Sequence, residues 1–242
     1  MASSLPFTFP HAQEEIRRRR ALILAHLLAM DEGFCAMPVK SLQTTTLRAA
    51  LESYDRLFFN DYLSRSYGQI DVTLSSRLTS SAGKFIYARN PAKRFERAEI
   101  RMSSDFLFRL NEGPFTLNGL SVSTPQEAFL VVFEHELCHA LEAALYGSTG
   151  HSKRFLTLAN GLFSHTTTTH NLPTRKQAAA KDGLSVGMRA SFPYEGKQLS
   201  GLITYIGKTA TVMVPSLRGA YRDKMGRRYT KYRVPLELLQ KP

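Results

Sequence analysis

Residues 124–151, TPQEAFLVVFEHELCHALEAALYGSTGH, predict one long buried helix followed by a loop that turns back. Thr124 is a typical N-cap residue, Pro125 suits the first helical position, and Glu127 can complete a capping box with the threonine. Gly147 is the kind of residue that commonly follows the end of a helix. The residues between these signals are apolar on nearly every side, which indicates that the helix lies in the core.

This helix carries the pattern His-Glu-x-x-His. His135 and His139 lie one helical turn apart on one face, so one Zn²⁺ can accept a nitrogen from each at about 2.0–2.1 Å. Glu136 occupies the position that holds the general base in zinc peptidases. A solvated amphipathic helix is the alternative, but buried histidines and a buried glutamate need partners, which a metal ion provides. Glu142, one turn beyond His139, is expected either behind the metal ligands or on the surface.

A third ligand is expected after the helix. His151 is preferred, because Gly150 before it permits the chain to turn back toward the metal. A glutamate could take its place, but no acidic residue lies between His151 and Asp182. His165 and His170 are the alternative third ligands, and their other interpretation is a capped helix end and a surface loop.

The composition favours an anionic partner. The chain has 242 residues, enough for one large domain or two small ones, and 43% of them are hydrophobic. It holds 32 Lys and Arg against 20 Asp and Glu, and this net charge of +12 points first to nucleic acid. The two cysteines, Cys35 and Cys138, exclude a disulfide framework and a four-cysteine zinc ribbon. We find no signal peptide and no apolar run of transmembrane length, so we expect a cytoplasmic or nucleoid-associated protein without a membrane partner.

The segments around the central helix show further periodic patterns. In the first helix, Arg17–Arg20 cannot all share one face, so we interpret most of them as solvated, with phosphate contact as the alternative. Tyr54 belongs to the buried stripe of the second helix. We expect helices over residues 11–30, 44–63, 105–110 and 152–163, strands over 70–74, 83–87 and 98–102, and a loop over 111–123.

The C-terminal part changes to short strands, over 186–192, 198–206, 209–214 and 228–234, which suggest a small SH3-like β-barrel. Its basic residues interleave with tyrosines, as single-stranded nucleic acid binding requires. The alternatives are a solvated basic hairpin whose tyrosines pack the barrel, or a protein-binding module. The candidate contacts are Arg222, Lys224, Arg227, Arg228, Tyr229, Lys231 and Arg233.

The histidine pattern, followed by GHSKRF at residues 150–155, resembles the HExxH…GHxxxF of the SprT-like family of zinc metallopeptidases. The resemblance runs from the helix at 54–63 to Phe163 and includes residues 74–83 and 100–103. It implies an α+β, zincin-like fold with a small three-stranded sheet packed on the metal helix. It also implies one catalytic Zn²⁺ held by His135, His139 and His151, with Glu136 as the base.

Together these patterns predict four regions: a helical extension (1–40), a SprT-like metallopeptidase domain (41–172), a linker (173–183) and a basic SH3-like barrel (184–242). We expect a zinc endopeptidase in which Glu136 activates a zinc-bound water. The resemblance suggests DNA-associated or DNA-crosslinked proteins as substrates, and thus a role in DNA repair. By analogy with zincins, the substrate would lie along an edge strand at residues 100–103. The alternatives are a nucleic-acid- or protein-binding adaptor with a structural zinc site, and a metal-dependent hydrolase of non-peptide substrates.

Overall fold

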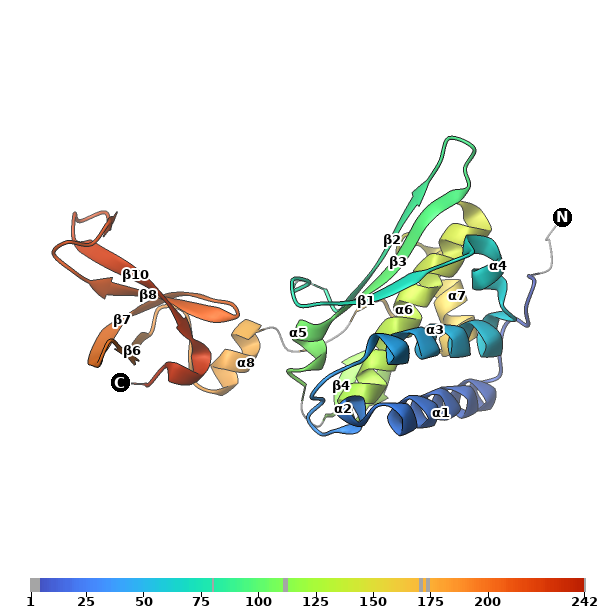
Figure 1. Cartoon of the computed structure of the whole chain (residues 1–242), viewed down its shortest axis with the longest axis horizontal. Coiled ribbons are helices and arrows are strands. Elements are labelled where there is room, and N and C mark those ends of the chain that lie inside the picture. The colour runs from blue at the N-terminus through green and yellow to red at the C-terminus, as the bar shows by residue number, and fades with distance from the viewer. Residues whose placement is uncertain (1–4, 80, 111–112, 170–171, 173–174, 242) are drawn as a thin grey trace. The chain divides into compact units, whose positions relative to one another are not determined.

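A computed structural model of the chain describes residues 5–79, 81–110, 113–169, 172 and 175–241. The chain forms two compact units, Met1–Leu172 and Pro173–Pro242. The first unit combines helices with a small mixed sheet, and the second is built on an antiparallel sheet (Figure 1). The predicted α+β class is therefore confirmed.

The first unit is built around one buried helix. This helix, α6, contacts α1, α4 and α7 as well as strands β2 and β3 (Figure 1). Phe133, Leu137 and Cys138 on α6 are fully buried, as the apolar pattern predicted. The helices of the unit are α1 (Gln13–Met30), α2 (Glu32–Cys35), α3 (Thr44–Phe59), α4 (Tyr62–Tyr67), α5 (Ser104–Leu107), α6 (Pro125–Tyr146) and α7 (Lys153–Phe163).

The three-stranded sheet has the order β1-β3-β2 and lies against α6. β1 (Asp71–Ser75) pairs parallel with β3 (Phe95–Ser103), and β2 (Gly83–Arg89) pairs antiparallel with β3 on its other side. Residues 100–103 therefore lie in the central strand, and the expectation that they form a substrate-binding edge is wrong. Both sides of their backbone are already paired, because the chain returns to place its third strand between the first two.

The predicted helix over 44–63 is divided in two. Asn60 and Asp61 adopt left-handed backbone angles, with φ of 50° and 58°, which end α3 and begin α4. The cause is Asp55, whose buried carboxylate accepts the backbone N–H groups of Leu63 and Ser64 at 2.9 and 2.8 Å. These bonds satisfy the free donors at the start of α4, so the break in the helix is stabilised by a cap.

The predicted loop over 111–123 contains a hairpin. β4 (Phe115–Leu117) pairs with β5 (Leu120–Val122) around Asn118 and Gly119, both of which have positive φ. Asn-Gly is the commonest sequence for such a two-residue turn. The signal was therefore present in the sequence, but the strands are too short to show alternation.

The second unit holds a five-stranded antiparallel sheet of order β6-β7-β8-β10-β9. Its core includes Phe192, Ile203, Val212 and Val234. The predicted linker contains a helix, and Ala179 of that helix is buried in the same core. The sheet is consistent with a small barrel, and the SH3-like topology stays a prediction. The elements are α8 (Arg175–Lys181), β6 (Arg189–Tyr194), β7 (Lys197–Ile206), β8 (Thr209–Pro215), β9 (Tyr221–Arg222), β10 (Arg228–Pro235) and a 3₁₀ turn (Leu236–Leu238).

Two arginines of the basic run on α1 contact other helices. Arg18 and Arg19 both bind Glu15 on the same helix, but of the two only Arg18 is solvated; Arg19 also donates to the backbone oxygen of Leu57 and lies 5.4 Å from the centre of the Phe58 ring. Arg20 instead forms a two-bond ion pair with Glu134 of α6, with both distances 2.7 Å. For Arg20, neither solvation nor phosphate contact is the correct interpretation, because its partner lies 114 residues away in the chain.

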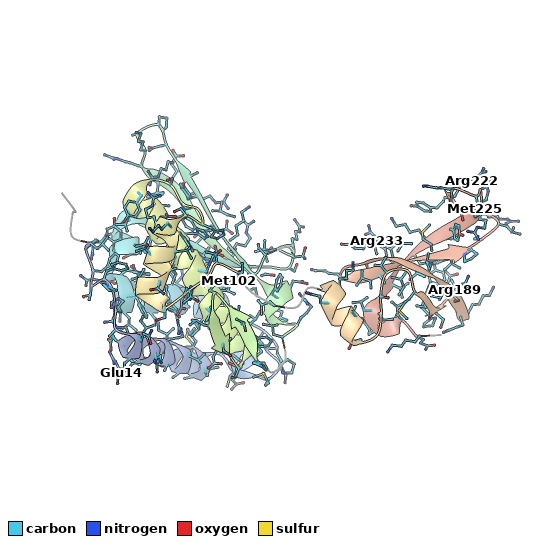
Figure 2. The ribbon with its side chains drawn as sticks, turned by 180° about the vertical axis from the view of Figure 1, so that it is seen from behind. Glu14, Met102, Arg189, Arg222, Met225 and Arg233 are labelled. Atoms are coloured by element: carbon cyan, nitrogen blue, oxygen red, sulfur yellow. The ribbon has the colours of Figure 1, made fainter. Side chains whose placement is uncertain are left out.

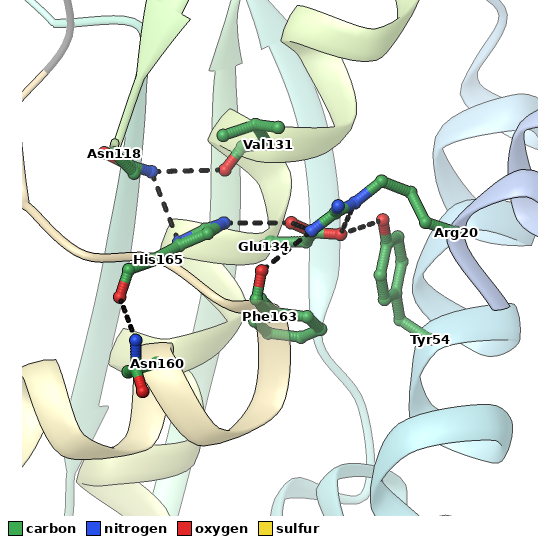
Figure 3. Close-up of polar contacts among 8 residues, drawn as sticks. All are labelled: Arg20, Tyr54, Asn118, Val131, Glu134, Asn160, Phe163 and His165. Atoms are coloured by element: carbon green, nitrogen blue, oxygen red, sulfur yellow. Dashed lines mark hydrogen bonds and ion pairs between the residues drawn. The ribbon is translucent and has the colours of Figure 1, made fainter. Parts of the chain in front are cut away.

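Glu134 is fully buried at the centre of a network of polar contacts (Figure 3). It accepts hydrogen bonds from Arg20 and from the Tyr54 hydroxyl at 2.8 Å, and its carboxylate lies 2.9 Å from Nε2 of His165. Arg20 also donates to the backbone oxygen of Phe163 at 3.0 Å. Burial opposes ionisation, but Arg20 and His165 lower the pKa of Glu134 to about 2. The Glu134 carboxylate and its partners therefore link α1, α3, α6 and the end of α7.

We expect Glu134→Ala to reduce the free energy of unfolding by about 3–5 kcal/mol, because it leaves the guanidinium of Arg20 buried without its carboxylate. Urea unfolding followed by circular dichroism measures the change. Glu15→Ala is the matched control, since it removes a partly exposed partner of two arginines and should have a much smaller effect. Equal losses in the two variants would contradict a structural role for the buried pair.

Candidate metal centre

The ends of α6 are fixed as the sequence predicted. The hydroxyl of Thr124 accepts the N–H of Glu127 at 3.2 Å, and the carboxylate of Glu127 accepts the N–H of Thr124 at 3.0 Å. Gly147 follows the helix with φ of 81°. This capping box and the left-handed glycine set where the helix begins and ends, and so they set the position of the histidines along it.

Three histidines converge at one point. The Nε2 atoms of His135 and His139 lie 3.2 Å apart, and that of His151 lies 2.9 Å from the first and 3.1 Å from the second. Three neutral rings cannot satisfy one another at such a point, because each Nε2 is either a donor or an acceptor. A cation satisfies all three. Tetrahedral ligands with Zn–N bonds of 2.0–2.1 Å lie about 3.3 Å apart, so the spacing fits a zinc-sized ion.

The alternative third ligands are not part of this cluster. His165 is fully buried, and its Nε2 lies against the carboxylate of Glu134 (Figure 3). Its Nδ1 lies 3.4 Å from the side-chain nitrogen of Asn118. His170 falls outside the described residues. Among the residues that the structure describes, His151 is therefore the histidine that joins the pair on α6.

The histidine rings are held from outside the cluster. Nδ1 of His139 lies 2.7 Å from the hydroxyl of Thr149 in the loop after α6. The ring of Phe155, on α7, lies 4.4–5.2 Å from the three imidazole rings, centre to centre. Such outer contacts orient metal-binding histidines and choose which ring nitrogen faces the ion.

Glu136 lies in the same cleft as the histidines and is buried. Burial raises the pKa of this carboxyl to about 8, although it accepts the backbone N–H of Phe85. Gly83 makes room for it: a Cβ at this position would come 2.7 Å from Cγ and Oε1 of Glu136. The start of β2 therefore lies directly against the proposed base.

A cleft of about 340 Å³ surrounds the cluster. Residues that the sequence did not mark as functional line part of it. Leu117 and Asn118 come from the β4–β5 hairpin, and Thr168 comes from the segment after α7. The Asn118-Gly119 pair was the available signal for the hairpin, and Thr168 had none. The full lining is Ser81, Ala82, Gly83, Lys84, Phe85, Leu117, Asn118, Val132, His135, Glu136, His139, Thr149, His151 and Thr168.

The second unit has a larger groove, of about 1060 Å³, on its sheet. Of the predicted nucleic-acid contacts, Arg222, Arg227, Arg228 and Tyr229 line it, together with Arg189. Apolar residues such as Leu202, Met213 and Leu217 line it as well. Figure 2 shows Arg189 and Arg222 on this unit, with Met225 in the turn between β9 and β10.

The other predicted contacts do not line this groove. Arg233 is an exposed residue of β10, and Lys224 is exposed in the β9–β10 turn. Lys231 lies over the ring of Tyr221, 5.7 Å from its centre. Two residues that do line the groove are engaged with Asp223. Arg227 forms an ion pair with it at 2.7 Å, and the hydroxyl of Tyr229 donates to it at 3.1 Å.

We expect the chain to bind one Zn²⁺, and His151→Ala to weaken that affinity by roughly 100-fold because one of three protein ligands is lost. Competition with a chromophoric chelator measures the affinity. His26→Ala is the matched control, because His26 is exposed on α1 and is not in the cluster. Unchanged affinity in His151→Ala would show that this histidine is not a ligand.

The comparisons with known proteins agree with the geometry. A model of the SprT-like family, whose general kind is metallopeptidase, matches residues 47–176, more than half of the chain. A search of the curated proteins found no match. None of the described helices is both long and apolar enough to span a bilayer. By its matched residues, this chain belongs to the SprT-like family.

Proposed function

We propose that the chain is a zinc-dependent endopeptidase. The observation that carries the proposal is the convergence of three Nε2 atoms within 2.9–3.2 Å of one another, in a cleft that also contains the carboxylate of Glu136. Family membership supports the peptidase class. The substrates that we propose are proteins associated with or crosslinked to DNA, met in the cytoplasm or on the nucleoid.

His135, His139 and His151 would hold the ion through their Nε2 atoms. Bound zinc supplies a Lewis acid that polarises the scissile carbonyl and makes water more acidic. Glu136 accepts the proton of the attacking water and delivers it to the leaving amine. Its position against Gly83 and Phe85 keeps the carboxylate in the cleft, and Thr149 holds the ring of His139.

An extended peptide would bind along β2. Among the described strands β2 pairs only with β3, so its other side can accept a further strand through backbone hydrogen bonds. Residues 83–85 at the start of β2 line the cleft. A peptide paired here would pass the metal ligands and Glu136. β2 thus takes the place of residues 100–103 as the proposed substrate-binding strand.

The rival proposals make different demands on the site. A structural zinc site in a binding adaptor normally has four protein ligands and no vacant position. The cluster has three histidines among the described residues, and a carboxylate stands beside them in an open cleft. This arrangement favours catalysis. A hydrolase of non-peptide substrates would use the same groups, so the assay must include such a substrate.

We expect Glu136→Gln to retain one Zn²⁺ per chain and to lose about 10²- to 10⁴-fold in peptide hydrolysis, because an amide cannot accept the proton. Metal analysis and casein cleavage, each on the parent and the variant, test this. Equal cleavage by both would remove Glu136 as the base. A zinc-loaded parent that cleaves no protein would favour the adaptor, and one that cleaves only a nitrophenyl ester would favour the non-peptide hydrolase.

We further propose that the second unit binds single-stranded nucleic acid. The charge of the chain is concentrated there: Pro173–Pro242 holds 14 Lys and Arg against 4 Asp and Glu, whereas Met1–Leu172 holds 18 against 16. The groove combines arginines for phosphates with apolar and aromatic surface for bases. An acidic peptide is the competing partner, since it needs the same charges.

We expect the double variant Arg222→Ala/Arg228→Ala to weaken binding of a fluorescent oligothymidylate by about tenfold and to lower the salt-dependence slope by about 1.4, or 0.7 for each lost phosphate contact. Fluorescence anisotropy at several salt concentrations measures both. Lys197→Ala/Lys208→Ala is the matched control, because it removes the same charge outside the groove. Equal weakening by both pairs would show attraction without a specific groove, and binding of an acidic peptide alone would support a protein partner.

A further inference from the structure

The third histidine reaches the metal site on a short irregular segment that needs support. His151 lies between the end of α6 at Tyr146 and the start of α7 at Lys153, and both Gly147 and Gly150 belong to the segment. Glycine-containing segments lose much conformational entropy when they are held in one shape. An interaction that fixes the segment before the ion arrives therefore increases the affinity for the ion.

Glu142 makes such an interaction. Its side chain is fully buried, and one oxygen accepts the backbone N–H of Gly150 at 3.0 Å. The other oxygen accepts the guanidinium of Arg154 at 2.8 Å and the hydroxyl of Ser152 at 3.4 Å. Gly150 and Ser152 are the two neighbours of His151, so one carboxylate binds the backbone on one side of the ligand and a side chain on the other.

Further contacts join this arrangement to the two helices. The hydroxyl of Ser152 accepts the N–H of Phe155 and caps α7. The guanidinium of Arg154 lies 4.4 Å from the centre of the Tyr146 ring at the end of α6. Although burial opposes ionisation, hydrogen bonds from Arg154 and Gly150 hold the pKa of Glu142 below its ordinary value. The carboxylate is thus a charged link between α6, the segment and α7.

We infer that Glu142 is a positioning residue for the metal centre, which fixes the segment carrying His151 and so determines how tightly the ion is held. The inference rests on the proposed metal site and adds to it a residue outside the His-Glu-x-x-His pattern. A positioning role and a purely structural role for Glu142 predict changes in different measured quantities. A structural role changes the free energy of unfolding, whereas a positioning role changes the affinity for the ion in the folded chain.

The test compares Glu142→Gln with the parent in the full chain. The amide cannot carry the charge that faces Arg154, and it replaces one acceptor by a donor. We expect the Kd for Zn²⁺, from chelator competition, to rise about 10- to 100-fold. The visible absorption of the Co²⁺-loaded variant should also weaken, because fewer chains hold tetrahedral cobalt.

Glu99→Gln is the matched control. Glu99 is another buried carboxylate of the first unit, bound by Thr73 at 2.7 Å and by Arg101 at 2.8 Å, and it does not line the cleft. We expect this variant to melt at a lower temperature but to keep the Zn²⁺ affinity of the parent. If Glu142→Gln does not fold, the Kd for Zn²⁺ of Arg154→Met tests the inference instead. The side chain of Arg154 is 44% exposed, so its loss is compatible with folding, and the Kd for Zn²⁺ should rise in the same direction by less.

The outcomes separate the two proposals. Unchanged Zn²⁺ affinity in the folded Glu142 and Arg154 variants overturns the inference and leaves the metal site intact. An equal loss of affinity in Glu99→Gln also overturns it, since the effect would then follow stability alone. A folded parent that binds no Zn²⁺ overturns the metal site, and the inference with it.

Discussion

A helix enclosed by the core must satisfy every polar group that it buries, and α6 carries three buried glutamates and two histidines beyond its first turn. Each buried carboxylate has a different set of partners. Glu134 meets Arg20, Tyr54 and His165; Glu136 meets the backbone of β2; and Glu142 meets the segment that returns with His151. Because an unpaired buried charge costs several kcal/mol, these partners must be in place wherever α6 is folded. The surroundings of the metal cluster follow from this constraint.

Patterns local in sequence predicted the part of the site that lies on α6. The i, i+4 spacing of His135 and His139 and the cap at Thr124 are properties of a single helix, and all were readable without the fold. His151 was preferred as the third ligand because of the glycine before it and the absence of a following acid, but His165 stayed an alternative. The difference between them is that His165 turns to Glu134 on another side of the helix, which only the packing of α7 decides.

The features that were missed depend on contacts that hydrophobic periodicity does not encode. The sequence pattern did not distinguish Arg20 from the three arginines before it, because its partner Glu134 lies 114 residues away. The central place of β3 follows from pairing order, which strand patterns do not contain. The break at Asn60 depends on Asp55, a buried cap that resembled an ordinary polar residue on a helix. For Arg20 and Asp55 a specific polar contact overrode the simplest periodic interpretation.

Two of the three histidines lie on a buried helix, whereas the third lies on a short irregular segment, so substitutions near them have different effects. His135 and His139 are held by a helix whose caps and buried neighbours also hold the fold, so substitutions around them would lower stability together with affinity for the proposed ion. His151 is held by a short segment whose main anchor is one carboxylate. Substitutions in that segment can alter affinity while most of the core is unchanged. Because a ligand that binds only the folded chain stabilises it by an amount that grows with the logarithm of its affinity, the segment would also determine how much stability a bound ion adds.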